Sequence, residues 1–403
     1  MNTYVEINLD DLRNNVKCIK EKYSEYEYYM AVLKADAYGH GISIIKDLYE
    51  SGINYFAVFS LEEAIKARTF CDAPILVFEP VPIERVKEAA NNDITVTVHT
   101  LDYAKELSTL EFNRPIRVHI MLNTGMNAIG VSVQDEVKEI IALVEENNDL
   151  VLEGIYTHFM TVGVFDNIWD KQLDKFNELT NLIDLEKVPM VHISNSTNLL
   201  AHKKLPYCNT ARMGQLIYGY NVTQIRSNIG LKNKLRNIRT DLKRRIYKIS
   251  DICYNIKLEL KPVMSFYTKI MQIISLKKGD NFGYNATFKA DKDMLIGILP
   301  IGYSNGIGQL NNNRYVIINN KNYRVIGSIG MNSMAVEING LVSINDKVYV
   351  LGHGITLGML SRGTNLSNTE ILLGIGRNNK RAYIKDGKEV ENYECTKIGG
   401  SQA

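Results

Sequence analysis

The chain has 403 residues, enough for about two to three domains, or for one large barrel with a smaller domain. Apolar residues make up 45% and charged residues 23%, a balance that argues against disordered, collagen-like and coiled-coil proteins. There are 47 basic and 45 acidic residues, so the net charge of +2 gives no reason to expect nucleic acid or a membrane as a partner.

Cysteine and histidine usage, together with hydropathy, indicates a cytoplasmic protein. The five cysteines show no CxxC spacing, so we expect neither a disulfide framework nor a structural zinc site. The histidines show no ligand spacing either, and we predict no metal. The polar N-terminus is unlike a signal peptide, and no run of about 18 apolar residues is long enough to span a membrane.

In chain order, the first half alternates short apolar runs with amphipathic stretches, such as the helical patterns at 60–69 and 133–145. Eight repeats of strand, crossover and parallel strand predict an α/β fold, a (β/α)8 TIM-like barrel. A doubly wound sheet is the alternative, because periodicity does not decide closure. The expected strands are residues 29–33, 55–59, 75–78, 95–98, 117–122, 154–158, 190–193 and the region of 216–218.

The pattern changes after the barrel, which we expect to span residues 10–225. Residues 226–258 are helical in character and strongly basic, which favours a solvated insertion; a docking surface for an acidic partner is the alternative. Residues 259–403 are predicted to form a mainly β C-terminal domain, which an N-terminal strand at 1–9 joins. Its expected strands include 315–318, 335–338 and 347–351.

The most informative stretch follows the first barrel strand and reads Ala-Val-Leu-Lys-Ala-Asp-Ala-Tyr-Gly-His-Gly from residue 31 to residue 41. An apolar strand ends at Lys34, and catalytic groups of barrels lie at the carboxyl ends of their strands. Partial burial there lowers the pKa of an amine and makes it nucleophilic, so that it can hold an aldehyde cofactor as a Schiff base. A surface lysine whose stem packs on the protein is the alternative.

These eleven residues resemble the pyridoxal-phosphate lysine motif of the alanine racemase family. Further motifs that are similar to those of the family follow in order across most of the chain. They are Thr157-His158-Phe159, Asn195-Ser196, Arg212-x-Gly214, Tyr218-Gly219, Gly279-Asp280 with Tyr284, Gly302-Tyr303-Ser304-Asn305-Gly306 and Gly330-Met331-Asn332.

The resemblance implies a pyridoxal 5'-phosphate enzyme with two bases. Lys34 is implied as the Schiff-base lysine and one base, and Tyr284 as the other, supplied by the partner subunit of a homodimer. Arg212 is implied to face the pyridine nitrogen, with His192 orienting it and His158 shaping the local field. The remaining implied cofactor contacts, mainly to the phosphate, are Tyr38, Asn195, Ser196, Gly214 and Gln215.

One family motif is altered. On the fifth strand Met121 stands where the family usually has a lysine, and Ala128 stands where it has an arginine that supports substrate binding. Both members of one interaction are lost together, which leaves no unpaired buried charge. Asn127 and Arg377 are the candidates for binding the substrate carboxylate instead. Tyr303 and Met331 complete the implied substrate site, and Asn332 replaces a usual aspartate after Met331.

We therefore expect an amino-acid racemase that interconverts L- and D-alanine. A racemase for serine or another small or polar amino acid is an alternative, as is a non-racemising pyridoxal-phosphate enzyme or binding protein on the same scaffold. Tyr284 separates these readings, since a binding protein has no need of a tyrosine on the second face of the substrate. A protein that binds partners through its basic insertion would hold no cofactor at all.

Overall fold

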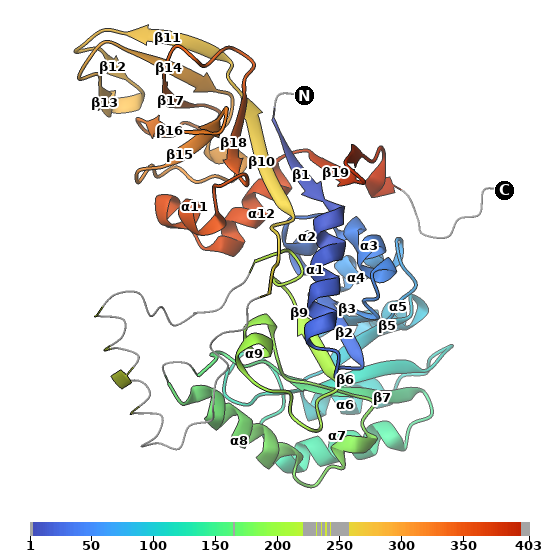
Figure 1. Cartoon of the computed structure of the whole chain (residues 1–403). Coiled ribbons are helices and arrows are strands. Elements are labelled where there is room, and N and C mark those ends of the chain that lie inside the picture. The colour runs from blue at the N-terminus through green and yellow to red at the C-terminus, as the bar shows by residue number, and fades with distance from the viewer. Residues whose placement is uncertain are drawn as a thin grey trace, which may run out of the picture. The chain divides into compact units, whose positions relative to one another are not determined.

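The computed structural model describes residues 3–163, 166–220 and 258–395, together with Leu231, Leu235, Ile238, Arg239 and Leu242. The basic insertion expected at 226–258 thus lies almost entirely outside the described residues. The chain divides into two compact units, shown in Figure 1. Unit 1 comprises Met1–Leu12, Ala35–Ile44 and Pro262–Thr396, and unit 2 comprises Arg13–Lys34, Ile45–Lys261 and Lys397–Ala403.

Unit 2 contains an eight-stranded parallel sheet in the order β8-β7-β6-β5-β4-β3-β2-β9, which confirms the predicted TIM-like barrel. Asn209 ties the two end strands together: its Oδ1 accepts the Val191 N–H at 3.1 Å, and its Nδ2 donates to the Pro189 carbonyl at 2.7 Å. The strands are β2 (Tyr28–Val32), β3 (Tyr55–Val58), β4 (Ile75–Val77), β5 (Ile94–Val98), β6 (Ile116–Leu122), β7 (Leu150–Thr157), β8 (Met190–His192) and β9 (Thr210–Met213).

The eighth strand was expected at 216–218, and that prediction is wrong. The strand is Thr210–Met213, whose polar Thr210 and Arg212 interrupt the apolar pattern that marks a buried strand. Residues 216–218 form turns instead, and Leu216 and Tyr218 are fully buried there. A short apolar run signals burial, and it does not by itself distinguish a strand from a buried turn.

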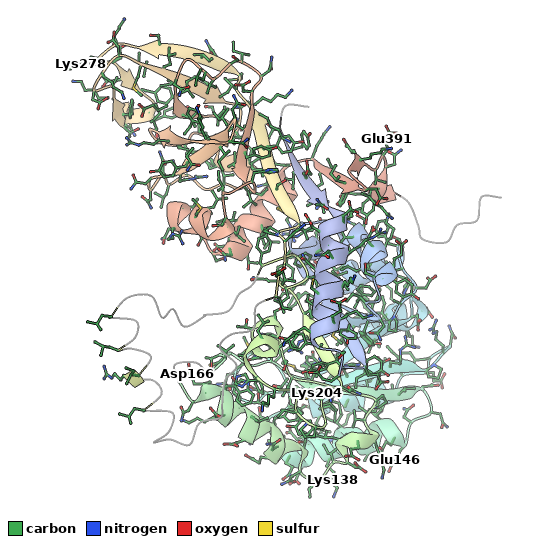
Figure 2. All side chains as sticks on the ribbon, in the orientation of Figure 1. Lys138, Glu146, Asp166, Lys204, Lys278 and Glu391 are labelled. Atoms are coloured by element: carbon green, nitrogen blue, oxygen red, sulfur yellow. The ribbon has the colours of Figure 1, made fainter. Side chains whose placement is uncertain are left out.

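Helices surround the strands of unit 2 (Figure 1). In α7 the buried side chains recur at helical spacing (Val137, Ile140, Val144), while Lys138 and Glu146 lie at the outer edge of the unit in Figure 2. No helix among the described residues is long and apolar enough to cross a membrane. The helices are α1 (Leu9–Lys22), α3 (Ile45–Glu50), α4 (Leu61–Arg68), α5 (Val86–Asn91), α6 (Leu101–Ser108), α7 (Gln134–Glu145), α8 (Ile168–Thr180) and α9 (Ser196–Ala201).

Unit 1 is built on a ten-stranded sheet in the order β11-β14-β17-β16-β15-β18-β10-β1-β19-β20. The N-terminal strand β1 (Tyr4–Asn8) runs antiparallel to β10 and parallel to β19, with Val5 opposite Phe266 and Arg381. The other strands are β10 (Met264–Lys269), β11 (Gln272–Leu276), β14 (Met294–Leu299), β15 (Tyr315–Ile318), β16 (Lys321–Ile326), β17 (Met334–Ile338), β18 (Lys347–Leu351), β19 (Arg381–Lys385) and β20 (Lys388–Glu389).

Two helices and a small hairpin complete unit 1. The helices are α11 (Leu357–Thr364) and α12 (Asn368–Asn378), and α12 begins at a capping box in which Ser367 and Glu370 exchange hydrogen bonds. The hairpin pairs β12 (Asn281–Phe282) with β13 (Phe288–Lys289), and its tip carries Tyr284, followed by Asn285 and Ala286 with φ of 59° and 49°. The mainly β character predicted for this part of the chain is therefore confirmed.

Candidate active site

The chemistry-bearing residues of unit 2 gather at the carboxyl ends of its parallel strands. Lys34 lies just beyond β2, His158 directly follows β7, and Arg212 lies near the end of β9. Because the carboxyl ends of parallel strands meet at one mouth of a barrel, these three basic groups share one electrostatic environment. The positive charges of Arg212 and Lys34 therefore contribute to lowered pKa values at this mouth.

The amine of Lys34 has a lowered pKa. Its side chain is open to solvent, yet its pKa is lowered, first by partial desolvation at the barrel mouth and then by repulsion from the Arg212 guanidinium; the carboxylate of Glu63 opposes the shift. An amine that is both reachable and more easily deprotonated is a better nucleophile than an ordinary surface lysine. The structure therefore gives Lys34 the property that Schiff-base chemistry requires.

Arg212 is the fixed positive charge of this mouth, and its side chain is only 3% exposed. One terminal nitrogen lies 3.1 Å from Nδ1 of His192, and the other donates to the Thr157 carbonyl at 2.9 Å and lies 3.2 Å from Nδ1 of His158. The guanidinium carbon also lies 5.7 Å from the centre of the Tyr156 ring. These contacts hold the planar guanidinium in one orientation.

His158 is kept neutral by its surroundings. Burial, followed by repulsion from Arg212 and Lys34, lowers the pKa of its ring to about 3. Since a guanidinium can only donate, Nδ1 of His158 accepts the hydrogen bond from Arg212, and the ring proton is on Nε2. His158 therefore offers a donor rather than a charge to any group bound at the mouth.

Three of the expected phosphate contacts, Asn195, Ser196 and Gly214, lie where α9 begins against β9. Asn195 caps α9, with Oδ1 accepting the N–H groups of Thr197 and Asn198 at 3.0 Å. Ser196 is nearly buried, and its hydroxyl oxygen accepts the Gly214 N–H at 2.8 Å. The amide of Gly214 is therefore already engaged within the protein. The structure brings these residues together and leaves the hydroxyl proton of Ser196 for another acceptor.

The four residues after Lys34, which include Tyr38, form a left-handed turn with φ between 54° and 57°. For non-glycine residues this conformation costs roughly 1–2 kcal/mol each. Asp36 stabilises the turn: one carboxylate oxygen accepts the Ile42 N–H at 3.0 Å, and the other pairs with Arg381 at 2.5 Å. Gly39 follows with φ 84°, where a Cβ would lie 2.5 Å from a carbonyl oxygen of α12.

Tyr284 and the expected substrate residues lie on exposed loops of unit 1. The exposed fractions are 79% for Tyr284, 55% for Met331 and 38% for Tyr303. Two backbone hydrogen bonds join the loops, from Tyr303 to Gly330 and from Ser304 to Met331, each 3.0 Å long. The ring of Tyr284 lies beside Gly330. Three large side chains therefore face solvent on one connected group of loops in the isolated chain.

The two candidates for the substrate carboxylate belong to different units. Asn127 is exposed in the loop after β6, where its N–H donates to Oδ1 of Asn123 at 3.0 Å. Arg377 is exposed on the last turn of α12 in unit 1. Met121 is buried inside β6, whereas Ala128 is exposed, so the apolar replacement is accommodated in the core and the small one at the surface.

Sequence reasoning missed the buried His119 and the partly buried Glu153, which contact the network around Arg212. Neither residue has a role assigned from the sequence. Both join Arg212 through His192 by hydrogen bonds: His119 lies 2.9 Å from His192 and 3.2 Å from Glu153. The available signal was a carboxylate that directly precedes a glycine within an apolar strand, an unusual place for a charge.

Comparison with known proteins identifies the family of this chain. The model of the alanine racemase N-terminal domain matches residues 7–222, and that of the alanine racemase C-terminal domain matches residues 263–383. An alanine racemase of Borreliella burgdorferi is 32% identical over 393 residues, which cover 95% of this chain and 97% of that protein.

Solved structures agree with this assignment. The alanine racemase of Clostridium difficile 630 superposes with a TM-score of 0.82 at 28% identity, over 97% of this chain and 98% of that one. A histidine racemase from Leuconostoc mesenteroides, at 22% identity and a TM-score of 0.79, covers 96% of this chain and 98% of its own, and shows the same fold. The chain therefore belongs to the alanine racemase family of amino-acid racemases.

Proposed function

We propose that this protein is a pyridoxal-phosphate-dependent racemase that interconverts L- and D-alanine, with Lys34 and Tyr284 as its two bases. One observation carries the proposal: a solvent-reachable lysine whose pKa is lowered stands beside the buried guanidinium of Arg212 at a barrel mouth. Membership of the alanine racemase family supports both the reaction and the cofactor.

The donor set at the mouth fits pyridoxal 5'-phosphate. Lys34 offers a nucleophilic amine for the aldehyde, and Arg212 offers a fixed donor for the ring nitrogen. The phosphate is assigned to the hydroxyls of Ser196 and Tyr38, to Asn195, and to the backbone at Gly214 and Gln215. The Gly214 N–H, which here donates to the Ser196 hydroxyl oxygen, would turn to the phosphate when the cofactor binds. When bound, the cofactor withdraws electrons from the α-carbon of the substrate and so makes its proton removable.

The protein's own groups then move that proton. Lys34 Nζ serves one face of the α-carbon, and the hydroxyl of Tyr284 of the partner subunit serves the other, so that one removes a proton and the other returns it. The 79% exposure of Tyr284 in the isolated chain supports a homodimer in which this side chain completes the site of the other subunit. His158, held neutral, donates without adding a second charge beside Lys34.

Arg212 favours proton return over other outcomes. A guanidinium stays charged at all relevant pH values and can only donate, so it favours an unprotonated ring nitrogen opposite it. The spread of negative charge into the ring is thereby limited, which favours racemisation over transamination. The hydrogen bonds from Arg212 to Thr157 and its contact with His192 keep the guanidinium in place for this role.

Alanine is the proposed substrate because family membership favours it. The replacements at Met121 and Ala128 remove the usual support for the substrate carboxylate, so serine or another small polar amino acid is the second candidate. Asn127, Arg377, Tyr303 and Met331 are the proposed substrate contacts. A non-racemising enzyme on this scaffold would keep Lys34 but would not need Tyr284.

The test is racemisation of a panel of L-amino acids by the protein loaded with pyridoxal 5'-phosphate. We expect a visible absorbance band that borohydride abolishes, and turnover that is fastest with alanine. A band without racemisation of any amino acid would point to a binding protein or to another reaction. Turnover that is fastest with serine would replace alanine as the substrate while leaving the reaction type in place.

A further inference from the structure

A β-bulge in β7 aims a carboxylate toward a buried histidine of β6. In the pairing of β6 with β7, Val118 is opposite Leu152, but His119 is opposite Gly154, so Glu153 is the extra residue of β7. A bulge interrupts the alternation of a strand and re-aims the side chain that it carries. Here it directs a carboxylate toward the interior histidine of the neighbouring strand.

The bulge also gives that histidine a defined seat. A Cβ on Gly154 would lie 2.5 Å from the ring of His119, so the imidazole packs directly on the backbone of Gly154. Its Nε2 lies 3.2 Å from Oε2 of Glu153 and 3.4 Å from the Tyr55 hydroxyl oxygen. The pair Glu153-Gly154 therefore supplies both the acceptor and the space for the ring of His119.

Other donors hold the Glu153 carboxylate in its charged form. Thr95 and Tyr55 donate to Oε2, the former at 3.0 Å, and Nε of Arg117 lies 3.3 Å from Oε1. Burial by itself raises the pKa of this carboxyl group, but the hydrogen bonds from His119 and Tyr55 and the charge of Arg117 outweigh it, so the pKa lies below its usual value.

Donor and acceptor rules fix the direction of every hydrogen bond between Arg212 and Glu153. Arg212 can only donate, so Nδ1 of His192 accepts at 3.1 Å and the proton of that ring is on Nε2. Nε2 of His192 then donates to Nδ1 of His119 at 2.9 Å, which leaves the His119 proton on Nε2, directed at Glu153. Both rings are neutral, and the His119–Glu153 contact is a hydrogen bond rather than an ion pair.

The ring of His192, in the middle of this series of hydrogen bonds, is held in place by its neighbours. The His192 ring is fully buried and stacks on Tyr156, with ring centres 4.7 Å apart and planes within 4°. Burial, followed by the charge of the neighbouring Arg212, lowers the pKa of His192 well below its usual value, which agrees with a neutral ring. The series of hydrogen bonds from Arg212 to Glu153 therefore has one stable arrangement of its protons.

We propose that Glu153 is a positioning residue for Arg212: through His119 and His192 its carboxylate fixes the tautomers of two buried imidazoles and thereby the orientation of the guanidinium. The arrangement of the four groups stands on the geometry alone. Its consequence for catalysis rests on the proposed function, in which Arg212 faces the ring nitrogen of the cofactor. Glu153 lies on β7, reaches Arg212 only through His119 and His192, and has no proposed contact with a reacting atom.

Histidine-labelled 15N NMR of the protein tests the proton arrangement directly. The chain has seven histidines, so the spectrum is simple, and the His119→Phe and His192→Gln variants assign the two rings. We expect both rings to be neutral with the proton on Nε2 at pH 7, with and without pyridoxal 5'-phosphate. A doubly protonated ring at either position, or a proton on Nδ1 of His192, would overturn the proposal.

Three variants interrupt the series of hydrogen bonds from Arg212 to Glu153 at different points. Glu153→Leu removes the terminal acceptor, His119→Phe removes the link but keeps a ring, and Gly154→Ala keeps every hydrogen-bonding group while displacing the His119 ring. Each should lower kcat roughly 10- to 100-fold with a smaller change in KM, because Arg212 is misoriented. The double variant Glu153→Leu/His119→Phe should have a kcat no lower than that of the poorer single variant, since both substitutions interrupt the same series of hydrogen bonds.

Two matched controls separate loss of positioning from disruption of the local structure around Glu153. Glu153→Gln keeps an oxygen acceptor for His119, and Tyr55→Phe removes a different donor from the same carboxylate; both should keep the wild-type tautomers, absorbance band and kcat. If Glu153→Leu does not fold, His119→Phe and the wild-type spectrum still decide. Wild-type tautomers and kcat in Glu153→Leu would refute positioning. Absence of racemisation in the wild type would refute the proposed function instead and leave the NMR expectation standing.

Discussion

At the scale of single residues, desolvation and one permanent charge together shift the pKa values of the groups at the barrel mouth. Arg212 is buried and always charged, and it lowers the pKa of both Lys34 and His158. Desolvation is the larger cause at both groups, and the charge of Arg212 acts in the same direction, so a neutral imidazole and a more easily deprotonated amine result. The reactivity of Lys34 therefore follows first from its partial burial at the strand end and then from the charge of Arg212 on β9.

This electrostatic account predicts opposite shifts from two substitutions. Arg212→Gln removes the repulsion and should raise the pKa of Lys34, whereas Glu63→Gln removes an attraction and should lower it further. The pH dependence of the rate at which the cofactor band forms reports this pKa. A shift in the same direction for both variants would show that Lys34 is not controlled by these charges.

The substrate carboxylate gives a second prediction at this scale. Arg377 is the only cation of the two candidates, and a charged hydrogen bond contributes about 1.5–3 kcal/mol. Arg377→Ala should therefore raise the KM for alanine about ten- to a hundredfold, and Asn127→Ala should raise it less. Steady-state kinetics with alanine and serine decide; an unchanged KM for Arg377→Ala would remove this residue from the substrate site.

At the scale of elements, the turn that follows Lys34 belongs to unit 1 and is held by an arginine of that unit. The turn stores unfavourable backbone energy in four left-handed residues, and the partly buried pair of Asp36 and Arg381 holds it. Arg381 also contacts Glu394 and the Gly39 carbonyl. The position of Tyr38 therefore depends on an arginine more than 300 residues away in sequence, since Asp36 and Arg381 are 345 positions apart.

Loss of this pair should be measurable. Arg381→Met leaves Asp36 partly buried without its partner, which should lower the free energy of unfolding by roughly 3 kcal/mol and weaken cofactor binding. Arg324→Met is the matched control, because Arg324 is exposed on β16 and its loss changes the net charge equally. Equal urea midpoints and cofactor affinities for the two variants would contradict the role given to Arg381.

Sequence patterns predicted most strands of the barrel, and the features that they did not predict have physical causes. The first seven strands follow from apolar runs that end in polar residues, but β9 carries Arg212 inside the strand and therefore lacks the expected pattern. The bulge at Glu153 and the contacts of His119 depend on register between strands, which one sequence does not reveal. The left-handed turn also has no signal, because Ala35 and Ala37 normally favour ordinary helix.

At the scale of the whole molecule, both units contain buried neutral histidines. Burial lowers the pKa of His40 to about 4 and that of His158 to about 3, and His192 lies well below its usual value. In the unfolded chain these rings bind a proton near pH 6.5. The unfolded state therefore takes up more protons as the pH falls, and the folded state loses stability below about pH 6.5.

The protein should consequently be acid-sensitive before its carboxylates titrate. Each such ring removes up to about 1.4 kcal/mol of stability per pH unit between pH 6.5 and its folded pKa. The urea midpoint should fall between pH 7 and pH 5, and the slope should be smaller for His158→Gln. The exposed His353 provides the control, since His353→Gln should keep the wild-type slope. A midpoint that is flat from pH 7 to pH 5 would contradict the neutral-histidine account.

The central claim is racemisation by two bases on opposite faces of the substrate, one of which comes from an exposed loop. The most direct measurement is α-proton exchange in deuterated water, followed separately from L- and D-alanine, for the wild type and for Tyr284→Phe. Loss of one positioned base should slow exchange from one enantiomer by roughly 10²–10⁴-fold and leave the other largely intact. Equal and small losses from both enantiomers would show that Tyr284 is not a base and would contradict the two-base account.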